Sequence, residues 1–253
     1  MLFNLYKKEV NKLKKETIIF LGLALIINIF FLYKTYNGWN LEAGFFINMF
    51  LLPAAFLIPL ILSESKLINQ EFKNNTIYLL MSLPVSSQKI FLSKFLAVIT
   101  QYIVSSLSII IFTGIQFIIF LNRTSYIQEI KTLLDIRIFS AAICFYIFSI
   151  VGLIYIVSTV FLSSIIGKTF KKYSKLISFG SFFLVLYIGG KIIGFMMNML
   201  EKVHISLPNN IETQIQILHK LGYEMLLISL IILFVTSAIY FIICRIYDKK
   251  IEI

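Results

Sequence analysis

Residues 64–94 read ESKLINQEFKNNTIYLLMSLPVSSQKIFLSK, and the rest of the chain is organised around this stretch. It is polar at both ends, whereas residues 77–83 (IYLLMSL) are almost wholly apolar. Seven residues of helix are only about 10 Å long, against a hydrocarbon thickness of about 30 Å in a bilayer. The apolar part is too short to cross a membrane.

The residues on either side of 77–83 predict a short, separate helix. Asn74 and Asn75 tolerate a left-handed turn, and Thr76 is suited to cap the helix that follows. Pro84 ends that helix because its ring forces the preceding residue out of the α region. Ser86 is then suited to cap the next helix. The sequence predicts a short transverse helix between two long ones.

An apolar helix in a water-facing loop must be covered, because apolar patches on soluble faces usually mark interaction sites. Residues 77–83 either fold back on the chain's own membrane helices, lie in the lipid interface, or insert into a groove on a cytoplasmic partner. The residues alone leave these alternatives open.

A set of residues in this stretch resembles the E-x-x-x-G-T…L-x-S-L-P-V-S…K pattern of bacterial ATP-binding-cassette (ABC) permeases. Its members are Glu71, Thr76, Leu80, Ser82, Leu83, Pro84, Ser86 and Lys94. More narrowly, the pattern is similar to that of the type-two permeases, which are related to the type V exporter fold. Asn75 stands where the family commonly has glycine, and Asn also visits the left-handed region.

The resemblance implies that residues 77–83 are a coupling helix that docks on an ATPase subunit. The implied docking residues are Glu71, Asn75, Thr76, Ile77, Leu79, Leu80, Ser82, Leu83 and Pro84. Among them, Leu79, Leu80 and Leu83 would form the packing surface, and Glu71, Thr76 and Ser82 would set the local geometry. The permease itself would be no enzyme and bind no cofactor, since ATP and Mg belong to the ATPase.

Composition places the whole chain in the membrane. Apolar residues make up 59% of the sequence and charged residues only 14%. The net charge of +11 is spread over loops between apolar runs, so we expect no nucleic-acid partner. Cys144 and Cys244 lie inside apolar segments without CxxC spacing, which favours small core residues over a disulfide or metal site.

We predict an all-α integral membrane protein of six spans in a single permease domain, 1–253. Its parts are an interfacial helix (1–16), spans 1 and 2 (17–62), the cytoplasmic coupling segment (63–89), spans 3 and 4 (90–166), a cytoplasmic loop (167–175), span 5 (176–197), an extracellular segment (198–224), span 6 (225–244) and a cytoplasmic tail (245–253). Sixteen of the 23 Lys and Arg residues then lie on the side of the N-terminus. The positive-inside rule therefore predicts that both termini and residues 64–94 are cytoplasmic.

Residues 1–16 predict an amphipathic helix at the cytoplasmic membrane surface. Apolar or uncharged side chains recur at helical spacing, with the lysines mostly off that stripe. The stripe consists of Phe3, Tyr6, Val10, Leu13 and Thr17. The alternative is a merely solvated basic tail.

Two other sequence features lack the residues that their chemistry requires. Gly167-Lys168-Thr169 ends like a phosphate-binding loop, but Leu162 occupies the position of the required first glycine. His204 and His219, in the long outer segment, are far apart and have no HExxH arrangement, so we expect no metal site. The energy source should therefore lie in another polypeptide.

Span 5 carries a GxxxG pair, Gly190 and Gly194, with Lys191 between them. The pair favours close approach of two helices, either in a dimer of two copies or within one chain. Lys191 either reaches the outer interface by snorkelling or lines a translocation cavity.

The resemblance implies a permease in a bacterial cell membrane that pairs with a second copy, identical or paralogous, and with two ATPase subunits. Permeases of this kind commonly export amphipathic peptides, such as phenol-soluble-modulin-like or bacteriocin-like peptides, or antibiotics and lipids. We expect an exporter of amphipathic peptides or similar compounds. The alternatives are a membrane receptor or immunity component that binds a toxin outside, and a channel.

Overall fold

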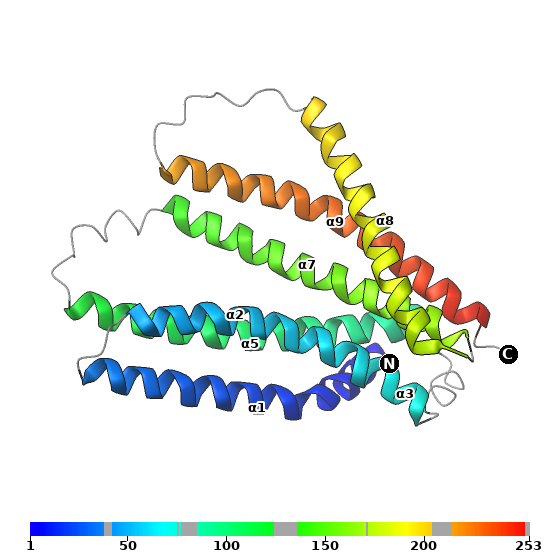
Figure 1. Ribbon diagram of the computed structural model, residues 1–253, viewed down its shortest axis with the longest axis horizontal. Helices are drawn as coiled ribbons and strands as arrows, with labels where there is room; N and C mark the ends of the chain where they lie inside the picture. Colours follow the sequence, from blue (N-terminus) through cyan, green and yellow to red (C-terminus); the bar gives the residue numbers. More distant parts are fainter. Residues whose placement is uncertain are drawn as a thin grey trace. The chain divides into compact units, whose positions relative to one another are not determined.

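The computed structural model describes residues 1–37, 42–74, 76, 85–123, 136–170, 172–203 and 214–250. Within these residues all regular structure is helical (Figure 1). The long helices are α1 (Leu2–Tyr36), α2 (Glu42–Leu62), α5 (Ser87–Arg123), α7 (Ile136–Lys168), α8 (Ser174–Val203) and α9 (Gln214–Lys250). Each of these six contains a stretch long and apolar enough to cross a membrane, which confirms the predicted all-helical architecture with six such helices.

Two short elements continue α2 beyond residue 62. The π-helical η1 (Ser63–Asn69) and α3 (Gln70–Lys73) follow without a break, because the backbone stays in the right-handed helical region at Leu62, Asn69 and Gln70. The helical rod that begins as α2 therefore extends as far as Lys73 and includes Glu71. Wide π turns inside helices are frequent at functional sites.

The predicted interfacial helix, residues 1–16, is part of α1, and its position at a membrane surface stays a prediction. Residues 1–16 and the first span form one helix, α1, because no glycine or proline lies at their junction. The buried face of α1 carries Leu5, Glu9 and Leu13, and of these only Leu13 belongs to the predicted stripe. Phe3, another member of that stripe, is 69% exposed. The burial of Glu9 is explained by its ion pairs, described below.

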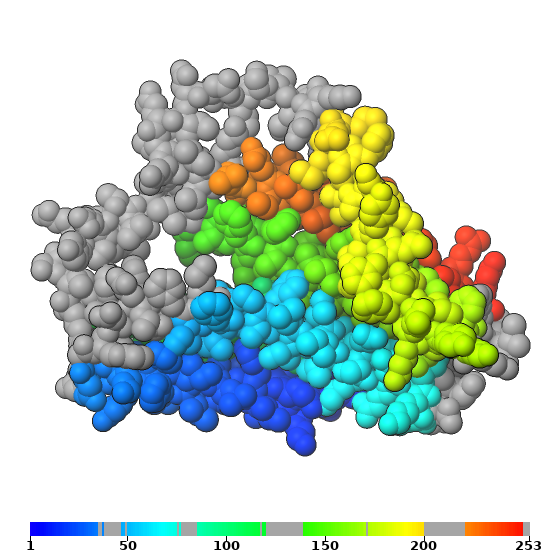
Figure 2. Space-filling model, in the orientation of Figure 1, coloured from blue at the N-terminus to red at the C-terminus, as the bar shows by residue number. Residues whose placement is uncertain are grey.

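The chain divides into two compact units, Met1–Ile130 and Lys131–Ile253, which are described separately. In the first unit α5 packs against both α1 and α2, and α1 and α2 lie side by side on the surface (Figure 2). Phe20, Ala55 and Ile109, one from each helix, form a buried core. The small Ala55 sits between Pro53 and Pro59 in α2 and leaves room for its neighbours.

In the second unit α7 packs along α9 and against α8. Gly189 of α8 lies against the Tyr155 ring of α7, and Gly222 of α9 approaches the backbone of Ala141. The turn between α7 and α8 contains Tyr173, whose φ of 63° is in the left-handed region. These close approaches fix the three helices of this unit against one another.

Candidate coupling site

The central residue of the candidate site is Glu71, in the last turn of helix before the apolar stretch 77–83. Its carboxylate accepts one hydrogen bond at each oxygen. Lys12 Nζ of α1 donates to Oε1 at 2.6 Å, and Lys94 Nζ of α5 donates to Oε2 at 2.7 Å. Glu71 therefore joins three helical segments that are far apart in the sequence.

Lys94 is buried, with its side chain only 3% exposed. Its ammonium group donates to Glu71 Oε2 and to the backbone oxygen of Leu67 at 2.7 Å, and it lies 3.5 Å from Glu9 Oε1. An ammonium group has three donors, so these partners account for all of them. A buried lysine is tolerated here because its charge is paired and hydrogen-bonded.

Glu9 supplies the second buried carboxylate. Lys12 Nζ lies 2.9 Å from Glu9 Oε2, one helical turn away on α1. Glu9, Lys12, Glu71 and Lys94, called the charge cluster below, thus contain two carboxylates and two ammonium groups. Half-exposed Lys8 lies within 3.7 Å of both carboxylates. The charges balance, which offsets part of the cost of their desolvation.

The charge cluster also sets the protonation of its members. Burial would raise the pKa of the Glu71 carboxyl, but the ammonium groups of Lys94 and Lys12 outweigh burial and hold its pKa below the usual 4.5. Burial would lower the pKa of Lys12, but the charges of Glu9 and Glu71 hold it above the usual 10.5. At neutral pH Glu71 is therefore ionised and Lys12 is protonated.

The structure brings together the two ends of the sequence motif, Glu71 and Lys94. Thr76 lies just beyond α3, and its hydroxyl donates to the backbone oxygen of Glu71 at 3.4 Å. The other predicted docking residues, Asn75, Ile77, Leu79, Leu80, Ser82, Leu83 and Pro84, lie outside the described residues. Glu71 and Lys94, which stand on either side of the apolar stretch 77–83 in the sequence, are therefore both held in the charge cluster.

With this geometry in place, the relationship to known proteins is clear. A family model described as ABC-2 family transporter protein matches residues 5–171. The chain belongs to this family. It is the membrane subunit of an ABC transporter, a multi-pass protein of the plasma membrane, and its family pairs with an ATP-binding-cassette ATPase. No curated protein and no solved structure matches this ABC-2 permease.

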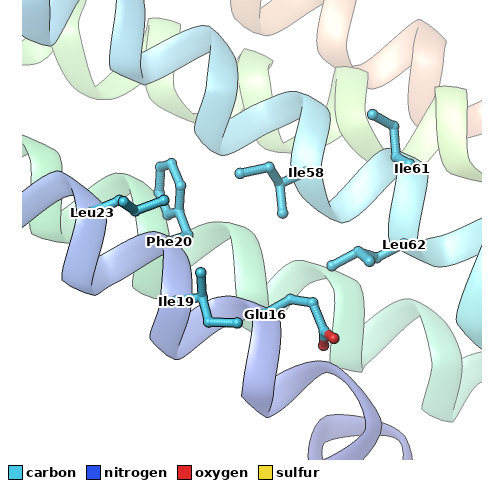
Figure 3. A pocket seen from close by; sticks show the side chains of 7 residues that line it. All are labelled: Glu16, Ile19, Phe20, Leu23, Ile58, Ile61 and Leu62. Carbon is cyan, nitrogen blue, oxygen red and sulfur yellow. The ribbon is translucent and has the colours of Figure 1, made fainter.

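Next to the charge cluster, the permease has an apolar crevice between α1 and α2, with a volume of about 270 Å³. Glu16, at its end, forms an ion pair with Lys66 of η1, which also donates to the backbone oxygen of Lys12. Figure 3 shows the remaining lining, which is entirely apolar: Ile19, Phe20, Leu23, Ile58, Ile61 and Leu62. The ion pair adds a second tie between α1 and the segment that leads to Glu71.

In α8 of the permease, Gly190 and Gly194 do not serve packing within the described residues. A side-chain carbon added at either would meet nothing within 4 Å, in contrast to Gly189, which faces Tyr155. Lys191 is exposed, and its ammonium group lies 5.7 Å from the centre of the Tyr187 ring. The GxxxG face of α8 is thus open.

The remaining sequence candidates have simpler roles. Gly167 lies where α8 approaches α7, since an added side-chain carbon would come within 2.7 Å of the Ser174 backbone oxygen. Its resemblance to a phosphate-binding loop is explained by helix packing. His204 lies outside the described residues, and His219 belongs to α9.

Sequence reasoning missed Glu9 and Lys12 as members of the site. Lys12 pairs with Glu71, which is 59 residues away along the chain, and Glu9 pairs with Lys94, which is 85 residues away; the local pattern of α1 does not indicate either distant partner. A usable signal was present, because Glu9 stands four residues from both Leu5 and Leu13 on one helical face. An acidic residue on an apolar stripe indicates a paired charge.

Proposed function

We propose that this permease subunit exports amphipathic peptides or similar amphipathic compounds, and that residues 77–83 are the coupling helix that docks on its ATPase. In this proposal both termini and residues 64–94 are cytoplasmic. The observation that supports the docking role is the charge cluster, which holds Glu71 and Lys94, on either side of residues 77–83, against α1.

The argument rests on what the charge cluster does mechanically. Glu71 and Lys94 flank the segment that contains the coupling helix, and they are hydrogen-bonded directly to each other. Separating them would leave buried charges unpaired, which is strongly unfavourable. A force applied to residues 77–83 is therefore passed to α3, α1 and α5 together. A segment that transmits motion to the membrane helices must be held firmly to them on both sides.

The open GxxxG face of α8 supports a second permease copy in the assembly. Gly190 and Gly194 leave a flat helix surface against which another helix can pack closely. The functional complex would then hold two permease subunits, identical or paralogous, and two ATPases that carry ATP and Mg. Lys191, beside these glycines, would face either the outer interface or the pathway between the two copies.

The test is co-purification of the permease with its ATPase from membranes, comparing the native chain with Leu80→Asp. A carboxylate in the apolar docking surface should abolish association and the ATP turnover that depends on it. Ser65→Asp is the matched control, because it adds the same charge at an exposed position of the same segment. Undiminished association of Leu80→Asp would overturn the docking proposal and place the ATPase contact elsewhere on the permease.

A further inference from the structure

Three side-chain amides meet inside the first unit, one each from α1, α2 and α5. Asn48 Nδ2 donates to Gln116 Oε1 at 3.0 Å, and Gln116 Nε2 donates to Asn28 Oδ1 at 2.9 Å. Asn28 Nδ2 donates to the backbone oxygen of Ala24 at 2.8 Å. All three side chains, called the amide cluster below, are buried. Neither the motif nor the docking proposal uses them.

The amide cluster lies far from the charge cluster along the same helices. On α1, Glu9 and Asn28 are separated by roughly 28 Å of helix, and on α5 Lys94 and Gln116 by roughly 33 Å. These spacings match the hydrocarbon thickness of a bilayer, about 30 Å. The helices α1 and α5 are thus joined by polar contacts at both ends of their membrane crossing.

Between the Glu16–Lys66 ion pair and the amide cluster, the core that α1, α2 and α5 share is apolar. Phe20, Ala55 and Ile109 fill the interface of the three helices. Apolar packing specifies a helix register less strictly than hydrogen-bonded amides do, because in hydrocarbon no water replaces a lost partner. The amide cluster is therefore the feature that fixes the register of α1, α2 and α5 at the outer end.

We propose that Asn28, Asn48 and Gln116 are positioning residues for transport: with the charge cluster they hold α1, α2 and α5 as one rigid body. This inference rests on the proposed function. When the ATPase displaces the coupling helix, the outer ends of these helices then move by the same amount as the inner ends. Without the amide cluster the inner ends move and the outer ends lag.

The experiment compares the native chain with Asn28→Leu/Asn48→Leu/Gln116→Met, each reconstituted with the ATPase. Replacing all partners by apolar groups of similar shape leaves no unpaired buried amide, so the variant should fold. Asn48→Leu, which retains the bond between Gln116 and Asn28, is a milder second variant. Thr113→Val is the matched control, because the Thr113 hydroxyl bonds only within its own helix, to Ile109 O.

Distances are measured by pulsed electron paramagnetic resonance in a background without Cys144 and Cys244. One spin-label pair is placed at exposed Tyr33 and Ile118, near the outer ends of α1 and α5, and another at Lys14 and Lys89, near their inner ends. Each pair is measured without nucleotide and with ATP plus vanadate.

In the native chain and in Thr113→Val, both distances should be the same in the two nucleotide states. In the triple variant the outer distance should shift by about 2 Å or broaden on trapping with ATP, while the inner distance stays fixed. Asn48→Leu should show a smaller change of the same kind. A native outer distance that changes with nucleotide, or a triple variant that behaves as native, would overturn the inference.

Co-purification of the ATPase in the same preparations separates this inference from the function it rests on. The triple variant should retain the ATPase, because the docking surface is untouched. Retained ATPase with a rigid outer pair in the triple variant rejects only the role of the amide cluster. Failure of the native chain to retain the ATPase rejects both.

Discussion

At the scale of single residues, Glu71 holds the candidate site together. Its carboxylate accepts hydrogen bonds from buried Lys94 and partly exposed Lys12, so its loss leaves Lys94 with an unbalanced charge. Breaking one partner of a buried ion pair typically costs about 3–5 kcal/mol, whereas replacing the whole pair by apolar groups is often close to neutral. The charge cluster is therefore expected to specify an arrangement more than to add stability.

A double-mutant cycle tests this directly. We expect Glu71→Gln to lower the thermal stability of the purified permease, by about 3 kcal/mol in unfolding free energy. Glu71→Gln/Lys94→Met should recover most of that loss, because no buried charge is left unpaired. The measurement is thermal unfolding in detergent. A Glu71→Gln permease as stable as the native one would show that the ion pairs of Glu71 do not stabilise the fold.

The charge cluster also predicts how stability depends on pH. Because the folded pKa of Glu71 is depressed, its contribution is present above its usual pKa of about 4.5 and is lost as the pH falls through the folded value. Because that of Lys12 is raised, its contribution is lost only as the pH rises above about 10.5. Thermal stability should therefore fall in acid. A Glu71→Gln permease should lose less of its stability in acid; an equal loss would place the acid-sensitive groups elsewhere.

At the scale of elements, α1 shows what local sequence can and cannot predict. Apolar periodicity predicted a helix over residues 1–16 and a span after it, and both are present in α1. The buried face differs from the predicted stripe in part because Glu9 is buried against Lys94 of α5. Periodicity reports hydrophobicity along one helix and carries no information about an ion pair made with another.

The two polar clusters of unit 1 also differ in how far the local sequence could predict them. The motif pointed to Glu71 and Lys94 because they flank one short segment. The amides of Asn28, Asn48 and Gln116 meet only after three helices have packed, so their partners depend on helix register. An amide inside an apolar span is itself a readable signal, since burial requires a partner. The identity of that partner had to come from the structure.

For α8, the open GxxxG face predicts the effect of a bulky residue on pairing. We expect Gly194→Ile to reduce the fraction of cross-linked permease dimer in membranes severalfold, because the added side chain prevents close approach of the second copy. Gly180→Ile is the control, since Gly180 also lies on α8 in open space but outside the GxxxG pair. Equal cross-linking of both variants would place the dimer contact elsewhere.

At the scale of the whole molecule, the family model covers the part of the chain that holds both polar clusters. The matched residues 5–171 contain every member of the charge cluster and of the amide cluster. The remaining residues supply α8 and α9, including the open face of Gly190 and Gly194. We infer that the first unit receives the motion of the ATPase and that α8 pairs with the second copy.

The central claim, that residues 77–83 dock on the ATPase, is tested most directly by photo-cross-linking in intact membranes. A photoreactive amino acid is placed at Leu80 of the otherwise native permease, and at Ser65 as the control on the same segment. We predict a covalent adduct with the ATPase subunit from position 80 and little or none from position 65. Adducts from position 80 that contain only the permease itself would contradict the account.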